Sequence, residues 1–169
     1  MTDFSITNEP ILGYLPGSQE RKDLEASIAK FSGQTEDIPI IIGGKEYRTD
    51  NVQYQVCTIL KTIREVFLTQ PNQVMPHDHQ KKVAKFYWAT PELVQLSIDT
   101  ALAAKKDWEA VPINDKIQMF LKVADQMADQ YRADLNATTM LGQAKTIIQA
   151  EIDSACELID FFRFLTWSS

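Results

Sequence analysis

The segment Met140–Phe164 is the feature of this 169-residue chain that most constrains its fold. Apolar residues recur there at alternating spacings of four and three, which is typical of an amphipathic helix: Ile148, Ile152, Ala155, Ile159 and Phe162. A second apolar row widens this stripe: Ile147, Leu158 and Phe161. We expect one turn followed by one long helix, buried over at least half of its circumference. Because the helix lies five residues before the last residue given, we also expect that the part which should cover it is missing.

The first third of the chain predicts an arm and a short helix. Residues 1–17 are punctuated by prolines and glycines, which favours an extended arm. Ser18 can cap a helix whose apolar positions include Leu24 and Ile28, and Gly33 is a suitable stop.

Two more helices are predicted before the last one. Thr90 followed by Pro91 is typical of a helix start, and that helix should run to about Trp108. Residues 112–114 should open the next helix, whose apolar positions extend far along the chain: Ile117, Phe120, Leu121, Ala124, Ala128, Tyr131 and Leu135. Thr138–Gln143, which contains Gly142, is then expected to form the bend into the last helix.

The strand signals are confined to the first ninety residues. Ile38–Ile42 and Lys45–Arg48 flank a Gly-Gly pair that can adopt the positive φ of a tight turn, which predicts a hairpin. Asn51–Val56 and Lys82–Ala89 are further strand candidates. The helices do not alternate with strands, so no complete βαβ unit is predicted.

Composition narrows the possible partners. The net charge of −6, with no basic patch, argues against nucleic acid or an anionic membrane as the main partner. No apolar run approaches the ~18 residues of a membrane span. The first ten residues hold two acids, and no Lys or Arg occurs before Arg21, unlike a secretory signal or a transit peptide.

Several motifs look functional but have a simpler interpretation. Gly43-Gly44-Lys45 and the Gly142–Thr146 segment lack phosphate-loop spacing, and G-x-G-x-x-G does not occur. His77-Asp78-His79 would need more ligands to hold a metal, so a solvated loop is favoured and no metal site is predicted. Cys156 has Asp153 and Glu157 nearby, which would raise its pKa, so a buried and unreactive thiol is favoured. Cys57 and Cys156 are both expected to be reduced.

The amino-acid sequence of the last helix also resembles that of a known family. MLGQAKTIIQAEIDSACELIDFFRF, with its GQ-x-KT, QAEID and ELIDFFRF elements, resembles the delta-1-pyrroline-5-carboxylate dehydrogenases, also called L-glutamate gamma-semialdehyde dehydrogenases, of the aldehyde dehydrogenase superfamily. Asn8–Arg21, Asn51–Val56, Lys82–Phe86 and Ile98–Ala110 resemble the amino-terminal region of that family. The resemblance covers nearly the whole chain, in order.

The resemblance implies a fold and a reaction. The complete enzyme would have an α/β aldehyde dehydrogenase-like fold. This chain would supply a mainly helical portion with a small antiparallel β element at about 38–56 and 82–89. The family oxidises its semialdehyde to glutamate in proline breakdown with NAD, through a thiolate, a general-base glutamate and an Asn that map to none of these residues. The resemblance therefore predicts no catalytic and no cofactor-binding residue here, and no cofactor for this part alone.

Glu157 is the single site residue that the resemblance assigns. From the residues alone, it is one of three acids on the polar side of the helix, with Asp153 and Asp160, and would face water. In the family, the glutamate at this position of ELIDFFRF lies beside the substrate pocket and meets the amino group of the substrate. A carboxylate suits that contact because the substrate is cationic. Phe161 and Phe162 are expected to be core.

Two stretches depart from the family pattern. Residues 57–74 are expected to be an insert, either an amphipathic partner helix or sequence read from an unspliced or alternative exon. Residues 165–169 are expected to be a divergent tail. The first hypothesis is therefore an amino-terminal portion that is inactive alone. It would work in the mitochondrial matrix by resemblance, although a cytoplasmic location is also possible without a visible transit peptide.

The second hypothesis belongs to another class. The chain would be a non-catalytic, truncated isoform that associates with full-length subunits through its exposed apolar helix. A third, an aldehyde dehydrogenase with another substrate, is disfavoured because QAEID and ELIDFFRF point to this subfamily.

Overall fold

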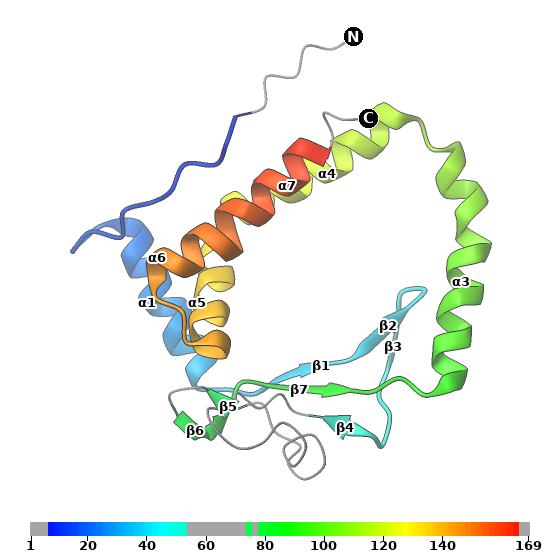
Figure 1. The fold of residues 1–169 in the computed structure, drawn as a ribbon, viewed down its shortest axis with the longest axis horizontal. Coiled ribbons are helices and arrows are strands. Elements are labelled where there is room, and N and C mark those ends of the chain that lie inside the picture. The colour runs from blue at the N-terminus through cyan, green and yellow to red at the C-terminus, as the bar shows by residue number, and fades with distance from the viewer. Residues whose placement is uncertain (1–6, 54–73, 76–77, 166–169) are drawn as a thin grey trace, which may run out of the picture. The chain divides into compact units, whose positions relative to one another are not determined.

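A computed structural model describes residues 7–53, 74–75 and 78–165 (Figure 1). The chain divides into two compact units. The helical unit comprises residues 1–30 and 111–169, and the strand unit comprises residues 31–110. Each unit is considered by itself, over its described residues. Most of the predicted insert, residues 57–73, lies outside the described residues, as do residues 166–169 of the predicted tail.

The strand unit is built on a three-stranded sheet with the order β1-β7-β4. β1 (Glu36–Ile38) pairs in parallel with β7 (Ala84–Tyr87), and β4 (Val52–Gln53) pairs antiparallel with the other edge of β7. β7 and β4 lie within the segments predicted as strands. The parallel pairing of β1 was not predicted, because pairing between distant segments leaves no local signal.

The predicted hairpin is confirmed. β2 (Ile40–Ile42) and β3 (Lys45–Tyr47) pair antiparallel across Gly43-Gly44. Both glycines have positive φ, 56° and 76°, which side chains on L-residues rarely tolerate.

A second, unpredicted hairpin corrects the interpretation of residues 77–79 as a loop. β5 (Val74–Met75) pairs antiparallel with β6 (Asp78–Lys82), so Asp78 and His79 lie in a strand. Strand pairing satisfies the backbone of this polar segment, whereas its amino-acid sequence is typical of a loop. His77 lies outside the described residues.

Helix α3 (Pro91–Ala110) begins where Thr90-Pro91 predicted. The Thr90 hydroxyl accepts a hydrogen bond from the backbone N–H of Leu93 at 3.4 Å. Every residue of α3 remains at least partly exposed, including apolar ones: Val94, Leu96, Ile98, Leu102 and Trp108.

The helical unit consists of an arm and a stack of helices. The arm (residues 7–17) has no helix or strand, as predicted, and leads into α1 (Gln19–Ser32). The remaining elements are α4 (Ile113–Ala128), α5 (Arg132–Gln143), α6 (Ile147–Ala150), the π-helix η1 (Glu151–Cys156) and α7 (Glu157–Leu165).

Helices α4 and α7 lie side by side and form the core (Figure 1). Ala124 of α4 meets Ala155 and Ile159, and all three are fully buried. Phe120 and Phe162 contact each other across the same interface, with ring centroids 5.7 Å apart and ring planes tilted by 45°. The prediction that Phe162 is core is thus confirmed.

The predicted course between α4 and the last helix was wrong in two respects. The helix expected to extend to Leu135 ends at Ala128, and α5 begins at Arg132. Gly142 stays within α5, and the bend lies at Ala144, which has a left-handed φ of 55°. A chain can place alanine there at a modest cost, so glycine was a misleading marker.

The long last helix is confirmed, but it is not a uniform α-helix. It begins after Thr146, which forms a capping box with Gln149, and continues through the π-helix into α7. A π-helix takes more residues per turn than an α-helix, so a stripe spaced by 3.6 residues does not stay on one face. Ile148, Ile152 and Phe161 consequently remain 49%, 42% and 59% exposed.

Candidate functional site

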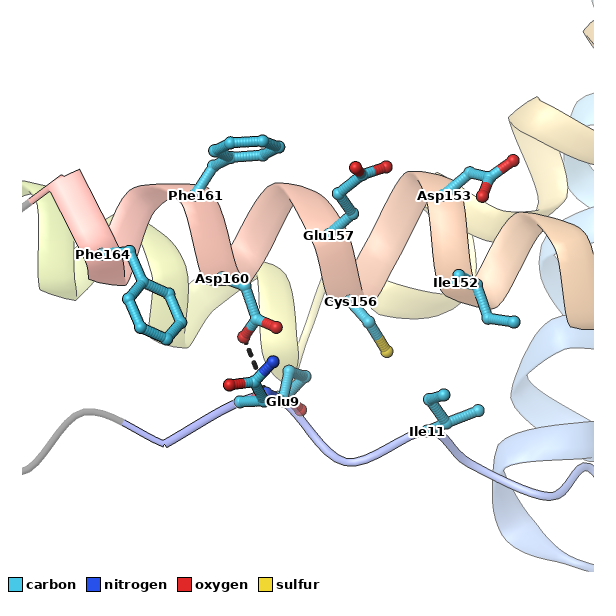
Figure 2. A pocket seen from close by; sticks show the side chains of 10 residues that line it. Glu9, Ile11, Ile152, Asp153, Cys156, Glu157, Asp160, Phe161 and Phe164 are labelled. Atoms are coloured by element: carbon cyan, nitrogen blue, oxygen red, sulfur yellow. Dashed lines mark hydrogen bonds between the residues drawn. The ribbon is translucent and has the colours of Figure 1, made fainter.

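A pocket of about 560 Å³ lies between the arm and the last helix (Figure 2). The arm contributes Asn8, Glu9 and Ile11. The helix contributes the remaining lining residues: Ile152, Asp153, Cys156, Glu157, Asp160, Phe161 and Phe164. The lining therefore combines apolar surface with several carboxylates.

The helix presents two rows of side chains at spacings of four. Ile152, Cys156 and Asp160 point toward the arm in Figure 2. Glu157 and Phe161 belong to the other row and point away from it. Phe161 was predicted to be core, and this was wrong, because it is exposed and lines the pocket. The π-helix directly precedes Glu157, and such segments often occur at functional sites.

The three carboxylates of the helix that line the pocket differ in their partners. Asp153 accepts a hydrogen bond from the Lys145 ammonium at 2.7 Å. Asp160 accepts one from the backbone N–H of Glu9, also at 2.7 Å (Figure 2). Glu157 is exposed, and no residue of the described ranges donates a hydrogen bond to it. Its carboxylate points away from the arm and is therefore available to a cationic group that approaches this outer side of the helix.

Next to this pocket lies a fully buried carboxylate, Glu151. One of its oxygens accepts from the backbone N–H of Leu12 at 2.8 Å, and the other accepts from the Tyr14 hydroxyl at 2.7 Å. The Asn136 amide and the Arg132 guanidinium donate as well. Burial alone would raise the pKa of Glu151, but these donors outweigh burial and hold the pKa below its usual value.

Burial and the carboxylate of Glu151 suppress the reactivity of Cys156. The thiol is buried, and burial together with the charge of Glu151 raises its pKa to about 11. The predicted buried thiol is confirmed, but the acids expected to raise its pKa were wrong: Glu151 and Glu9 do so, not Asp153 and Glu157. Cys156 is not an activated nucleophile. Cys57 lies outside the described residues.

Apolar periodicity did not reveal the buried charges of Arg132 and Glu151. Arg132 lies between Tyr131 and Leu135 of the predicted apolar stripe, and Glu151 lies beside Ile152 of the last one. Charged residues within an apolar stripe are the signal that could have found them, since buried charges need partners. No cluster of potential metal ligands occurs within residues 7–53, 74–75 and 78–165. No helix in these ranges is long and apolar enough to cross a membrane.

The protein-family model described as "Aldehyde dehydrogenase family" matches residues 68–168 of this chain. The chain belongs to the aldehyde dehydrogenase family. This match includes the π-helix and every helix-borne residue of the pocket.

Curated relatives agree with this assignment. Delta-1-pyrroline-5-carboxylate dehydrogenase of Mus musculus, named as mitochondrial, is 44% identical over 163 residues, which cover 96% of this chain and 26% of the relative. The Agaricus bisporus protein of the same name is 44% identical over 160 residues, or 94% of this chain and 26% of the relative. The chain thus spans about a quarter of the length of these relatives.

Solved structures give the same fold. The Delta-pyrroline-5-carboxylate dehydrogenase from Mycobacterium tuberculosis bound with NAD and cobalamin is 33% identical, with a TM-score of 0.84 over 99% of this chain and 28% of that chain. The structure of the same enzyme bound with NAD is 34% identical, with a TM-score of 0.82 over 95% of this chain and 27% of that chain. The aldehyde dehydrogenase-like fold, mainly helical here with a small antiparallel β element, is confirmed.

Proposed function

We propose that this chain acts as the amino-terminal part of an NAD-dependent dehydrogenase that oxidises L-glutamate gamma-semialdehyde to glutamate in proline catabolism. The observation that carries this proposal is the 44% identity to delta-1-pyrroline-5-carboxylate dehydrogenases along 96% of the chain. Because the mammalian relatives are named as mitochondrial, the mitochondrial matrix is the proposed location.

Within that function, Glu157 is proposed to bind the amino group of the substrate. Glu157 is among the residues that line the pocket, and its exposed carboxylate points away from the arm and has no donor among the described residues. A charge-assisted hydrogen bond to an ammonium group would supply both the missing partner and orientation of the substrate. The neighbouring Asp153 is already paired with Lys145, so it is the weaker candidate for this contact.

The pocket and the Gly43-Gly44 turn do not fit NAD. The pocket carries Asp153, Glu157 and Asp160, whose negative charge would repel a pyrophosphate. The Gly43-Gly44 pair forms a hairpin turn rather than opening a helix. NAD is therefore assigned to parts of the complete enzyme other than these residues, and the isolated chain is proposed to lack activity.

The function is tested with a chimera in which residues 1–169 replace the matching quarter of the mouse relative. NADH formation from the semialdehyde supports the proposal, and a folded but inactive chimera contradicts it. In the active chimera, Glu157→Gln should raise KM for the semialdehyde, whereas Asp153→Asn serves as the matched control on the same helix. Residues 1–169 alone should form no NADH above background.

A second candidate is a non-catalytic partner of full-length subunits. It is favoured by apolar side chains that remain exposed on the last helix, especially Phe161 at 59% and Phe164 at 39%. Residues 1–169 should then co-purify with the mouse enzyme, and Phe161→Ser should weaken this association. A monomer that does not bind the enzyme would exclude this candidate.

A further inference from the structure

The polar contacts of the arm converge on a few charged side chains. Arg132 donates to the Glu9 carboxylate and, at 2.7 Å, to the carbonyl oxygen of Pro10. Arg163 donates to the other oxygen of Glu9 at 2.5 Å. Glu151 accepts the backbone N–H of Leu12. The arm is thus held at consecutive points along residues 9–12.

These contacts are buried, which makes each partner indispensable. The side chains of Glu9 and Arg132 are each 7% exposed, and that of Glu151 is fully buried. Buried charges are tolerated only when they are paired and hydrogen-bonded. Arg132 is the common partner of both carboxylates, because its planar fork donates to Glu9, Pro10 and Glu151 together. The single ammonium of a lysine could not reproduce this geometry.

The same contacts determine the shape of the pocket. Asn8, Glu9 and Ile11 form its arm side, and Ile152, Cys156 and Asp160 face them from the helix (Figure 2). If the arm moved away, this wall would be lost, and Asp160 would lose the N–H of Glu9. The pocket therefore exists only while the arm is held.

We propose that Glu9, Arg132 and Glu151 form a latch that fixes the arm as one wall of the pocket. In this role they are positioning residues, which act on a bound molecule through the arm. The contacts of the latch are independent of the proposed function, but its effect on substrate binding rests on that function.

The latch is tested on residues 1–169 by hydrogen exchange at the amide of Leu12 and by thermolysin cleavage before Ile11 and Leu12. Glu9→Gln weakens the latch from the arm side and leaves the Arg132–Glu151 pair in place. Exchange at Leu12 should accelerate roughly ten- to a hundredfold, the factor expected for loss of one charge-assisted hydrogen bond. Amides in α4 and α7 should keep their rates. Arg132→Lys should release the arm to a similar extent.

Asp134→Asn is the matched control. Asp134 is also on α5, but it accepts from Ser27 and Lys30 of α1 rather than from the arm. Unchanged exchange at Leu12 in this variant supports the latch, and acceleration equal to that of Glu9→Gln overturns it. If Arg132→Lys does not fold, Glu9→Gln decides, and an unchanged Leu12 rate in that variant overturns the proposal.

A second measurement separates the latch from the proposed function. In the active chimera, Glu9→Gln should raise KM for the semialdehyde with little change in kcat, since it removes a wall rather than a reacting group. Accelerated Leu12 exchange with an inactive chimera supports the latch and contradicts the proposed function. Accelerated exchange with an unchanged KM overturns the positioning role.

Discussion

Glu151 and Arg132 of the helical unit are buried together, whereas Asp37 of the strand unit meets Arg48 and Lys85 at the surface. Both groups contain a carboxylate that pairs with an arginine and accepts a hydrogen bond from a tyrosine hydroxyl. At the surface, water can replace any lost partner, so an ion pair contributes little. In the interior nothing replaces it, so the buried group can fix the position of a segment as weakly structured as the arm.

The largest expected difference between the units comes from removing one cation in each. Arg132→Met would leave two carboxylates buried without their common partner and should lower the free energy of unfolding by about 3–5 kcal/mol. Arg48→Met should cause little or no change. Urea unfolding followed by circular dichroism measures both, and equal losses would show that burial does not distinguish the two clusters.

A second comparison lies within the last helix. Ile159 is fully buried against Ala124 and Ala155, so Ile159→Ala should cost about 2–5 kcal/mol through lost contacts and a cavity. Ile148 is 49% exposed on the same helix, so Ile148→Ala should cost well under half as much. Urea midpoints test this, and similar costs would place Ile148 in a buried interface.

Acid should affect the helical unit through Glu151. The pKa of this carboxyl is lower in the folded chain than its ordinary value of 4.5, so its ionised form stabilises folding above that value. This contribution should be lost as the pH falls from about 4.5 toward the lower folded pKa. Other carboxyls with a lowered pKa, such as that of Asp134, add to the loss of stability of the unsubstituted chain at low pH.

The contribution of Glu151 is isolated by comparing the parent with Glu151→Gln. The stability difference between them should be largest at neutral pH and should shrink below about pH 4.5. Urea midpoints across the acid range provide the measurement. A difference that stays constant with pH would mean that charge at Glu151 is not what stabilises the folded chain.

The smallest effect concerns chemistry at a single atom. Because the pKa of the Cys156 thiol is raised to about 11, iodoacetamide should modify it slowly at neutral pH in the folded chain. In urea the rate should approach that of an ordinary cysteine. Peptide mass spectrometry resolves this site from Cys57, and rapid modification of the folded chain would indicate that the arm does not cover the thiol.

The sequence predicted those elements that have local signals. Thr90-Pro91, Gly43-Gly44 and the stripe around Ala155 and Ile159 each act within a few residues, and all led to correct elements. The parallel pairing of Glu36–Ile38 with Ala84–Tyr87 was missed because it joins distant segments. The pairing of Glu9, Arg132 and Glu151 could not be predicted for the same reason, because these residues are distant in the sequence and meet only in the folded chain.

The candidate site was predicted only in part. The resemblance pointed to Glu157, and the structure describes it as exposed and without a donor among the described residues, but its substrate contact remains a proposal. Periodicity placed Phe161 in the core because it assumed a constant 3.6 residues per turn. The π-helix breaks that assumption for the residues that follow it.

The π-helix at Glu151–Cys156 therefore sets the phase of everything after it. One residue of an α-helix corresponds to a rotation of about 100° around the axis. Rewinding the same six residues as α-helix, with none removed, would turn α7 by about that angle relative to α6. The Cys156–Asp160 row would then leave the arm, although no residue of α7 had changed. The orientation of the pocket is encoded by the winding of a six-residue segment as much as by the side chains that line it.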